Sequence, residues 1–279
     1  MIVDAHHHFW DPALADYPWM TDGVAAIRRR FGPEDLEPLL REHGVDGTVV
    51  VQARASLDET RSLLETAAAT QFLLGVVGWI DLTGADVERE LAGLSGGALV
   101  GIRHQVHDEP DPAWLLRADV QRGIAAVGAA GLTFDLLVRT AELPAAVETA
   151  RRHPEMRFVL DHLAKPPLRG EDMDAWAGGL DALAALPNVT CKLSGLVTEA
   201  DWNAWRFAGL ASIHRSALDR FGADRCMFGS DWPVCLLAAQ YGDVLGLLRE
   251  ALDGLGEQER GEVLGGTAVR TYRLVPAAG

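Results

Sequence analysis

Residues 2–8 read IVDAHHH, which places two apolar residues shortly before a run of three histidines. Successive side chains of a β-strand point to opposite faces, so a strand here directs His6 and His8 to one side and His7 to the other. If this is the first strand of a barrel, its carboxyl end lies where such barrels carry their active sites. We therefore expect His6 and His8 to converge on a site, and His7 to make a hydrogen bond on the outer, helix-facing side.

Short runs rich in β-branched and apolar residues recur about every thirty residues, and each is followed by a segment with helical periodicity. Repeated strand-helix units predict a parallel sheet, and eight such units suit a (β/α)8 TIM barrel better than an open doubly wound sheet, although periodicity alone is compatible with both. The eight predicted strands cover residues 2–6, 47–52, 72–80, 99–105, 132–138, 157–161, 188–193 and 226–230.

The segments between these runs carry helix start and stop signals. Pro33 suits a first helical turn and Gly44 a helix end, while Ser56 and Glu59 have the spacing of a capping box. A longer helix is predicted over residues 199–221. Its Trp202, Trp205 and Phe207 would pack either on the barrel or on a second subunit, so the sequence allows a homo-oligomer.

Length and composition predict one globular domain over residues 1–279. The apolar share is 48% and the charged share 23%, both ordinary for such domains. No stretch reaches the roughly 18 uninterrupted apolar residues that a membrane span needs, and the first residues lack the pattern of a signal peptide. The expectation is a cytoplasmic protein that does not bind membranes.

The net charge of −15 opposes binding to nucleic acid or to anionic lipid, both of which select basic surfaces, and points to a small-molecule partner. The cysteines Cys191, Cys226 and Cys235 are an odd number without metal-ligand spacing. We expect them to be reduced core residues rather than a disulfide framework or a structural zinc site.

Residues able to do chemistry stand at the trailing ends of most of the predicted strands, where a barrel places its active site. They are His6 and His8, Gln52 and Arg54, Trp79 and Asp81, Arg103 and His104, Asp161, His162 and Lys165, Lys192 and Ser194, and Asp231 and Trp232.

Some of these positions leave alternatives open. Asp231 is either a helix cap or, as we favour, an inward-facing base or ligand. Arg103 and His104 are adjacent, so a regular strand turns only one of them inward, whereas a bulge would admit both. The rings of Trp10, Trp79 and Trp232 would either belong to the core or form a wall for a ligand of the size of a sugar.

Four motifs in barrel order carry a resemblance to a known family. They are DAHHHFWDP at residues 4–12, GIRH at 101–104, VLDHLAKP at 159–166 and FGSDWP at 228–233. Together they resemble the amidohydrolase superfamily, and more narrowly its branch rich in lactonases, which includes L-fuconolactonases and L-rhamnonolactonases. The resemblance extends over nearly the whole chain.

The resemblance implies a distorted (β/α)8 barrel hydrolase with His6, His8, His162 and Asp231 at the centre of its site. Two positions depart from the wider superfamily, because the fifth run ends in Arg139 without a histidine and the fourth has no lysine to bridge two metals. One expectation is that His6, His8 and Asp231 hold a single divalent cation, for which zinc is the best candidate. The other is that the enzyme works without a metal.

The implied reaction is the opening of a sugar-acid lactone, of the L-fucono or L-rhamnono type, to the aldonic acid. In this hypothesis Asp231 takes a proton from water while His6, His8 and His162 hold that water and polarise the carbonyl, directly or through a cation. The expected substrate-binding residues are Arg103, His104, Lys165, Trp10, Gln52, Trp79 and Trp232.

The sequence is also compatible with three other functions. A pyrone dicarboxylate lactonase would need several convergent cations for its dianionic substrate. A nonoxidative decarboxylase usually uses a metal with the histidine on the fifth strand, which this chain lacks. A noncatalytic metabolite-binding barrel would not require acid-base groups at so many strand ends. No motif names the sugar or its ring size.

Overall fold

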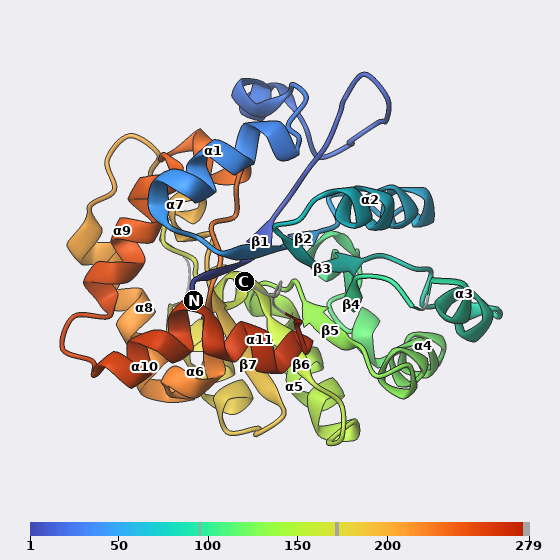
Figure 1. Ribbon diagram of the computed structural model, residues 1–279. Coiled ribbons are helices and arrows are strands. Elements are labelled where there is room, and N and C mark those ends of the chain that lie inside the picture. Colours follow the sequence, from blue (N-terminus) through green and yellow to red (C-terminus); the bar gives the residue numbers. More distant parts are fainter. Residues whose placement is uncertain (95, 171–172, 276–279) are drawn as a thin grey trace.

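The computed structural model of the protein describes residues 1–94, 96–170 and 173–275. Its centre is one sheet of parallel strands in sequential order, from β1 to β8. In Figure 1 the helices surround these strands. The strands are β1 (Val3–His7), β2 (Gly47–Val51), β3 (Leu73–Gly78), β4 (Leu99–His104), β5 (Thr133–Leu136), β6 (Phe158–Leu160), β7 (Val189–Leu193) and β8 (Cys226–Phe228).

The sheet closes on itself between the segment after β8 and the end of β1. Asp231 N donates to His6 O at 2.8 Å, His8 N donates to Trp232 O at 2.7 Å, and His7 forms a parallel bridge with Trp232. This pairing confirms the predicted (β/α)8 barrel and excludes the open sheet. It also brings both ends of the candidate site together, because His6 and Asp231 belong to the two segments that close the barrel.

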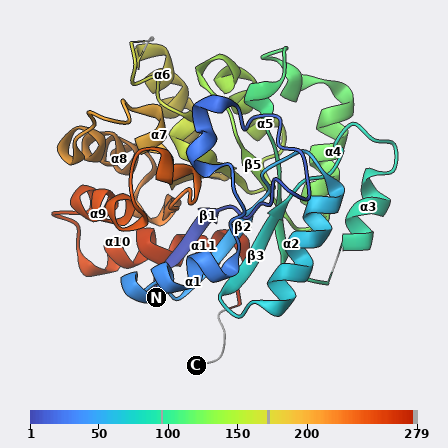
Figure 2. The same ribbon diagram turned by 90° about the horizontal axis from the view of Figure 1, so that it is seen from above.

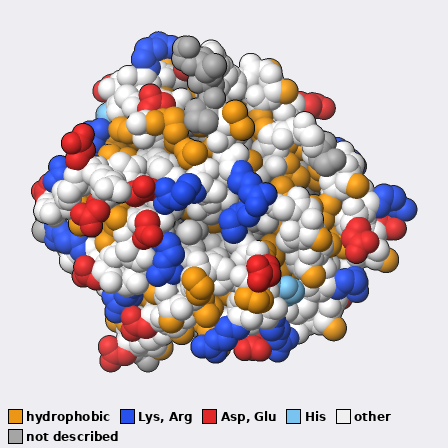
Figure 3. All heavy atoms as spheres, turned by 60° about the horizontal axis from the view of Figure 1, so that its bottom comes forward, with side chains coloured by type: hydrophobic (Ala, Val, Ile, Leu, Met, Phe, Trp, Pro, Cys, Tyr) orange, Lys and Arg blue, Asp and Glu red, His pale blue; other side chains and the backbone are white. Residues whose placement is uncertain are grey.

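Most of the α-helices pack around the outside of the barrel, as Figures 1 and 2 show, whereas α11 lies across one end of it. The α-helices are α1 (Pro33–His43), α2 (Leu57–Ala69), α3 (Val87–Leu94), α4 (Ala118–Ala129), α5 (Leu143–Arg152), α6 (Met173–Ala184), α7 (Leu196–Glu199), α8 (Phe207–Phe221), α9 (Tyr241–Ala251), α10 (Glu257–Gly261) and α11 (Thr267–Tyr272). None of the helices in the described ranges is long and apolar enough to cross a membrane. On the face drawn in Figure 3, basic and acidic side chains are interspersed.

The interior of the barrel has an apolar floor with polar layers above it. A buried cluster is formed by Val3 and Ala5 of β1, by valines and Met227 of other strands, and by Tyr272 of α11. Helix α11 therefore closes one end of the barrel. A register irregularity between Asp4 and His7 in β1 lets the strand place Ala5 in this cluster and His6 in the layer above it. The polar side chains are thus concentrated toward the carboxyl ends of the strands.

Several local expectations are confirmed. Pro33 is the first residue of α1, and Gly44 follows that helix in the left-handed region with φ of 67°. The three cysteines are buried and free. The capping box of α2 is only half formed: Ser56 Oγ accepts from Glu59 N, but the Glu59 carboxylate accepts from Ala53 N and Arg54 N instead of returning to Ser56.

The helix predicted over residues 199–221 is wrong in its first part. The chain forms α7, then a loop, and begins α8 only at Phe207. Trp202 and Trp205 lie in the loop, where their indole nitrogens donate to Thr198 O and Ala238 O. Both rings are therefore held by contacts within this chain. The sequence could not show this, because a hydrogen bond from an indole to a backbone carbonyl has no effect on the periodicity by which helices are predicted.

Candidate active site

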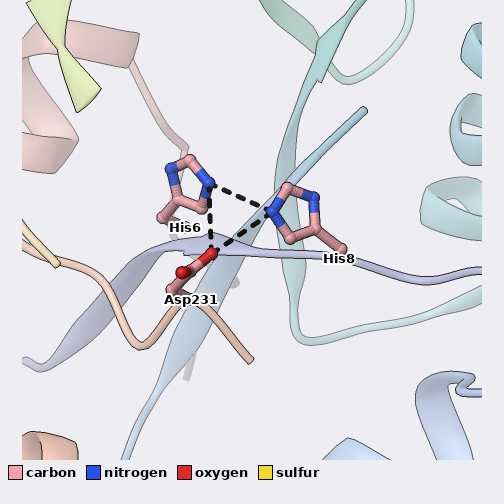
Figure 4. Close-up of side chains that lie close together, drawn as sticks. All are labelled: His6, His8 and Asp231. Atoms are coloured by element: carbon pink, nitrogen blue, oxygen red, sulfur yellow. Dashed lines mark hydrogen bonds and ion pairs between the residues drawn. The ribbon is translucent and has the colours of Figure 1, made fainter. Parts of the chain in front are cut away.

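Three side chains from the two closing segments point at one another at the carboxyl end of the barrel (Figure 4). His6 Nε2 is 3.2 Å from His8 Nε2, and Asp231 Oδ1 is 3.5 Å from His8 Nε2 and 3.9 Å from His6 Nε2. All three residues are buried. The sequence-based expectation that His6 and His8 converge and meet Asp231 agrees with this geometry.

The hydrogen bonds of His8 and His6 determine which ring nitrogens carry lone pairs at the common point. His8 Nδ1 donates to Val51 O at 2.8 Å, which leaves a lone pair on His8 Nε2. Arg103 Nη1 lies 3.2 Å from His6 Nε2, and because a guanidinium can only donate, His6 Nε2 must accept. The Nε2 lone pairs of His8 and His6 and one carboxylate oxygen therefore lie around one point, and the hydrogen bond from Arg103 occupies the lone pair of His6.

This donor set fits a divalent cation. Zinc–nitrogen bonds of about 2.0–2.1 Å in a tetrahedron separate neighbouring ligand atoms by about 3.3 Å. The separations of 3.2, 3.5 and 3.9 Å are close to that value. His6, His8 and Asp231 together could thus hold one metal ion, and His6, Asp161 and His162 are a second group of close ligand types.

A left-handed turn after β6 carries His162 to the same place. The four residues from His162 to Lys165 have φ between 49° and 57°, and Asp231 has φ of 56°. Such non-glycine conformations cost of order 1–3 kcal/mol each and persist only where the surroundings impose them. The turn leaves His162 Nε2 3.9 Å from Asp231 Oδ1, with His162 Nδ1 hydrogen-bonded to Ser194 Oγ at 2.8 Å.

A network of buried charges lies between these histidines and the apolar floor. Lys192 Nζ donates to Asp135 Oδ2 at 2.7 Å and lies 3.0 Å from Asp161 Oδ1. Arg103 Nη1 donates to Asp161 Oδ2 at 3.0 Å, and the Tyr272 hydroxyl donates to Asp135 Oδ2 at 2.6 Å. Each buried charge thus has an opposite partner, as burial requires.

These surroundings keep the imidazoles of His6 and His162 neutral and the central carboxyl ionised. Burial lowers the pKa of His162 to about 4, and burial also lowers the pKa of His6 well below its usual value. Burial raises the pKa of the Asp231 carboxyl, but the neighbouring His162 and His8 outweigh it and hold that pKa below its usual value. Asp231 is therefore a carboxylate at neutral pH.

Above this centre opens a pocket of about 340 Å³. It is lined by His8, Trp19, Ala53, Arg103, Gln105, His107, Asp108, Leu137, Arg139, His162, Lys165, Asp231 and Val234. Among the predicted substrate-binding residues, Arg103 and Lys165 reach this lining. Lys165 Nζ donates to Glu199 Oε1 at 2.8 Å, and Arg139 Nη1 lies 3.6 Å from Glu199 Oε2.

The structure resolves the choice between Arg103 and His104, because only Arg103 faces the interior. The His104 ring stacks on Trp114 with centroids 4.1 Å apart, and its Nε2 pairs with Glu109 at 2.7 Å. Trp79 Nε1 donates to His104 Nδ1, so both residues lie outside the pocket lining.

Three other predicted binding residues also lie behind the pocket wall. Trp10 donates through its indole nitrogen to Ile27 O, and the Trp232 ring packs edge-on against Phe31. Gln52 is buried, with its Nε2 donating to Arg103 O. His7 makes the expected hydrogen bond, but its partner is Thr48 of the neighbouring strand β2 rather than a helix.

Several residues of the site escaped the sequence argument. His107 and Asp108 line the pocket from a short 3-10 helix just beyond β4, and two polar residues directly after a predicted strand were a usable signal. Trp19 reaches the pocket from the long loop after β1. Asp135 sits in the middle of an apolar run, where its charge was the signal, whereas nothing in the sequence around Tyr272 connects it with the site.

Comparison with known proteins places the chain among enzymes with this architecture. The family described as Amidohydrolase matches residues 3–274. Two curated relatives named L-fucono-1,5-lactonase, from Burkholderia multivorans and Burkholderia ambifaria, are 44% and 42% identical to the chain. Both alignments cover 98% of this chain, with 96% and 95% of the respective relatives.

A solved structure gives the same result at the level of the fold. The crystal structure of an amidohydrolase from Burkholderia multivorans with bound zinc superposes with a TM-score of 0.94 at 43% sequence identity. The superposition covers 99% of this chain and 100% of that one. The barrel closed through His6 and Asp231, the four motifs and these alignments together show that the chain belongs to the amidohydrolase family.

Proposed function

We propose that the protein is a lactonase that hydrolyses L-fucono-1,5-lactone or a closely related sugar lactone. One observation carries the proposal: an ionised Asp231 stands among three imidazoles at the base of a pocket, in a chain up to 44% identical to L-fucono-1,5-lactonases. Hydrolysis of a lactone needs a base for water, positive charge near the carbonyl and a proton for the leaving ring oxygen. The residues around this pocket can supply all three.

In the proposed reaction, Asp231 removes a proton from a water molecule held beside His8 and His162. The water oxygen attacks the lactone carbonyl carbon, and the oxyanion that forms is stabilised by the positive charge of Arg103 and Lys165 at the pocket wall. The bond to the ring oxygen then breaks, and Asp231 returns its proton to that oxygen. The product is the open aldonic acid, and Asp231 is again a carboxylate.

The donor set of His6, His8 and Asp231 would hold a divalent cation, which when bound lowers the pKa of water and polarises a carbonyl. The residues outside that set keep their roles in either case. His162 stays neutral and orients water, while Lys165 binds oxygen atoms of the substrate.

The contacts of the pocket cations favour a neutral sugar over a dianionic pyrone dicarboxylate. Both Lys165 and Arg139 already face Glu199, at 2.8 and 3.6 Å. Their charges are thereby partly compensated, whereas a dicarboxylate would need cations that are free to pair with it. A polyhydroxylated ring, in contrast, can exchange hydrogen bonds with such a cation–carboxylate group.

The proposal is tested by offering the enzyme L-fucono-1,5-lactone and other five- and six-membered sugar lactones, with a pH indicator and with or without a chelator. Spontaneous hydrolysis is subtracted from each rate. We expect turnover of L-fucono-1,5-lactone, and the chelator arm reports whether a metal is needed. Lack of turnover across the whole series would refute the proposal.

Asp231→Asn tests the assignment of the base. Loss of a general base typically lowers turnover by about 10²–10⁴-fold. Asparagine tolerates the positive φ of this position, so the variant should fold. Asp81→Asn, at an exposed residue after β3, is the matched control and should keep wild-type turnover. Near wild-type turnover of Asp231→Asn would remove this residue from the mechanism.

A further inference from the structure

His6 lies between two buried cations, one at each nitrogen of its ring. Arg103 Nη1 is 3.2 Å from His6 Nε2, and Lys192 Nζ is 3.2 Å from His6 Nδ1. A neutral imidazole has one N–H and one lone pair, so only one of the two cations can donate a hydrogen bond to it. The protonated ring nitrogen needs an acceptor, and Asp161 Oδ1 lies 3.4 Å from His6 Nδ1.

The shapes of the two cations decide which nitrogen is protonated. The guanidinium of Arg103 is planar, so the direction of its Nη1 hydrogens is fixed, and one of them is aimed at His6 Nε2. The ammonium of Lys192 can rotate; it donates to Asp135 Oδ2 at 2.7 Å, and the negative charge of Asp161 Oδ1 lies 3.0 Å from it. His6 therefore carries its hydrogen on Nδ1, and its Nε2 lone pair receives the hydrogen bond from Arg103.

The same Nε2 atom is the one that His6 contributes to the donor set with His8 and Asp231. We propose that Arg103 competes with divalent cations for this lone pair, so that a metal binds at His6, His8 and Asp231 only weakly unless Arg103 gives up its contact with His6. The inference rests on that proposed donor set. It does not depend on the lactone reaction.

Two further observations support the competition. Arg103 is only 3% exposed, so its charge is poorly screened from a cation bound beside His6. It is also held firmly, because Nη1 donates to Asp161 Oδ2 at 3.0 Å and Nη2 donates to Gln52 O at 2.5 Å. Displacing the guanidinium to admit a metal would break contacts in a region where unpaired charge is costly.

Zinc affinity of the purified protein, measured without substrate by competition with a chromophoric chelator, tests the proposal. Arg103→Met removes the charge and the donor and should bind zinc about tenfold more tightly or better, since each 1.4 kcal/mol of repulsion removed gives a factor of ten. The matched control is Arg139→Met. Arg139 also lines the pocket, but its side chain is 52% exposed, so its removal should change the affinity by less than about threefold. His8→Ala in the Arg103→Met background should abolish the gain.

The proposal is overturned if Arg103→Met binds zinc no more tightly than the wild type. It is also overturned if Arg139→Met gains as much affinity as Arg103→Met, because the effect would then come from the loss of any positive charge near the pocket. If Arg103→Met does not fold, a measurement on the wild-type protein still tests the proposal. Nitrogen NMR of labelled histidines should show His6 as the Nδ1–H tautomer, with its signal identified by loss in His6→Gln. An Nε2–H tautomer would be incompatible with the hydrogen bond from Arg103. Either failure leaves lactone hydrolysis untouched.

Discussion

Glu59 is a buried carboxyl that ties the end of β2 to helix α2. Its Oε2 accepts hydrogen bonds from Ala53 N at 2.9 Å and Arg54 N at 3.0 Å, and burial raises its pKa from 4.5 to about 7. Between these two values the folded protein holds a proton that the unfolded chain has released. The contribution of Glu59 to the free energy of unfolding therefore falls as pH rises from 4.5 to 7 and is constant above that range.

Glu59→Gln should remove this dependence on pH, because the amide oxygen can still accept both backbone hydrogen bonds without carrying charge. Urea unfolding at pH 5, 6, 7 and 8 should show the wild type losing up to about 3 kcal/mol more than the variant over this range. Glu65→Gln, at an exposed residue of the same helix, should follow the wild type. Parallel curves for wild type and Glu59→Gln would contradict the assignment.

At the level of single residues, the sequence revealed the central group of the site better than its walls. His6, His8 and Asp231 could be placed together because alternation along a strand and closure of a barrel are general rules. Trp10 and Trp232 could not be placed, because an aromatic ring near a strand end can turn to either side. In the structure Trp232 packs on Phe31, a residue of the loop before α1.

Two connections between elements fix the position of His162. The left-handed turn after β6 carries the imidazole, and Gly195, directly before α7, lies beneath it with φ of 70°. A Cβ on Gly195 would lie 2.5 Å from His162 Nδ1. The close approach thus requires glycine at this position for two reasons, its conformation and its lack of a side chain.

Gly195→Ala should therefore lower turnover by about 10–100-fold, because displacing a reacting group by about 1 Å can cost two orders of magnitude. Gly44→Ala is the matched control: its φ is 67°, and a Cβ there would meet nothing within 4 Å. Backbone strain should cost both variants about 1 kcal/mol of stability, the overlap with His162 should cost Gly195→Ala a further amount, and only Gly195→Ala should lose activity against the sugar lactone. Equal turnover in the two variants would show that His162 is not positioned by this contact.

Element boundaries were predictable where a local signal ends them. Pro33 and Gly44 bound α1 as expected because their backbone preferences are intrinsic. The start of α8 was not predictable, since the loop before it is held by Trp205 through the carbonyl of Ala238, a residue 33 positions away. Contacts of this kind exist only after the barrel has formed.

Across the whole molecule, Asp4 joins the two closing segments to the outer helix α9. Its Oδ1 accepts from Ser230 N at 2.8 Å, and its Oδ2 accepts from the Tyr241 hydroxyl at 3.0 Å. Both Asp4 and Tyr241 are buried. The seam of the barrel therefore depends on a carboxyl that accepts hydrogen bonds from two residues at the far end of the sequence as well as from His6 N.

Tyr241→Phe should lower the free energy of unfolding by about 1–3 kcal/mol, because Oδ2 of the buried Asp4 carboxyl loses the hydroxyl that donates to it. The ring itself, stacked on His43, is retained in the variant. Urea unfolding at neutral pH measures the change, and turnover should fall only if the seam also shifts Asp231. A variant as stable as the wild type would mean that another group takes over the contact with Asp4.

The closure of the barrel also bears on how the protein matures during synthesis. His6 leaves the ribosome early, but its partner Asp231 follows more than two hundred residues later, and Tyr272, which donates to Asp135 beneath the site, follows later still. Pairings this distant in sequence form slowly. A nascent chain therefore cannot assemble the complete site before nearly all of residues 1–272 has emerged.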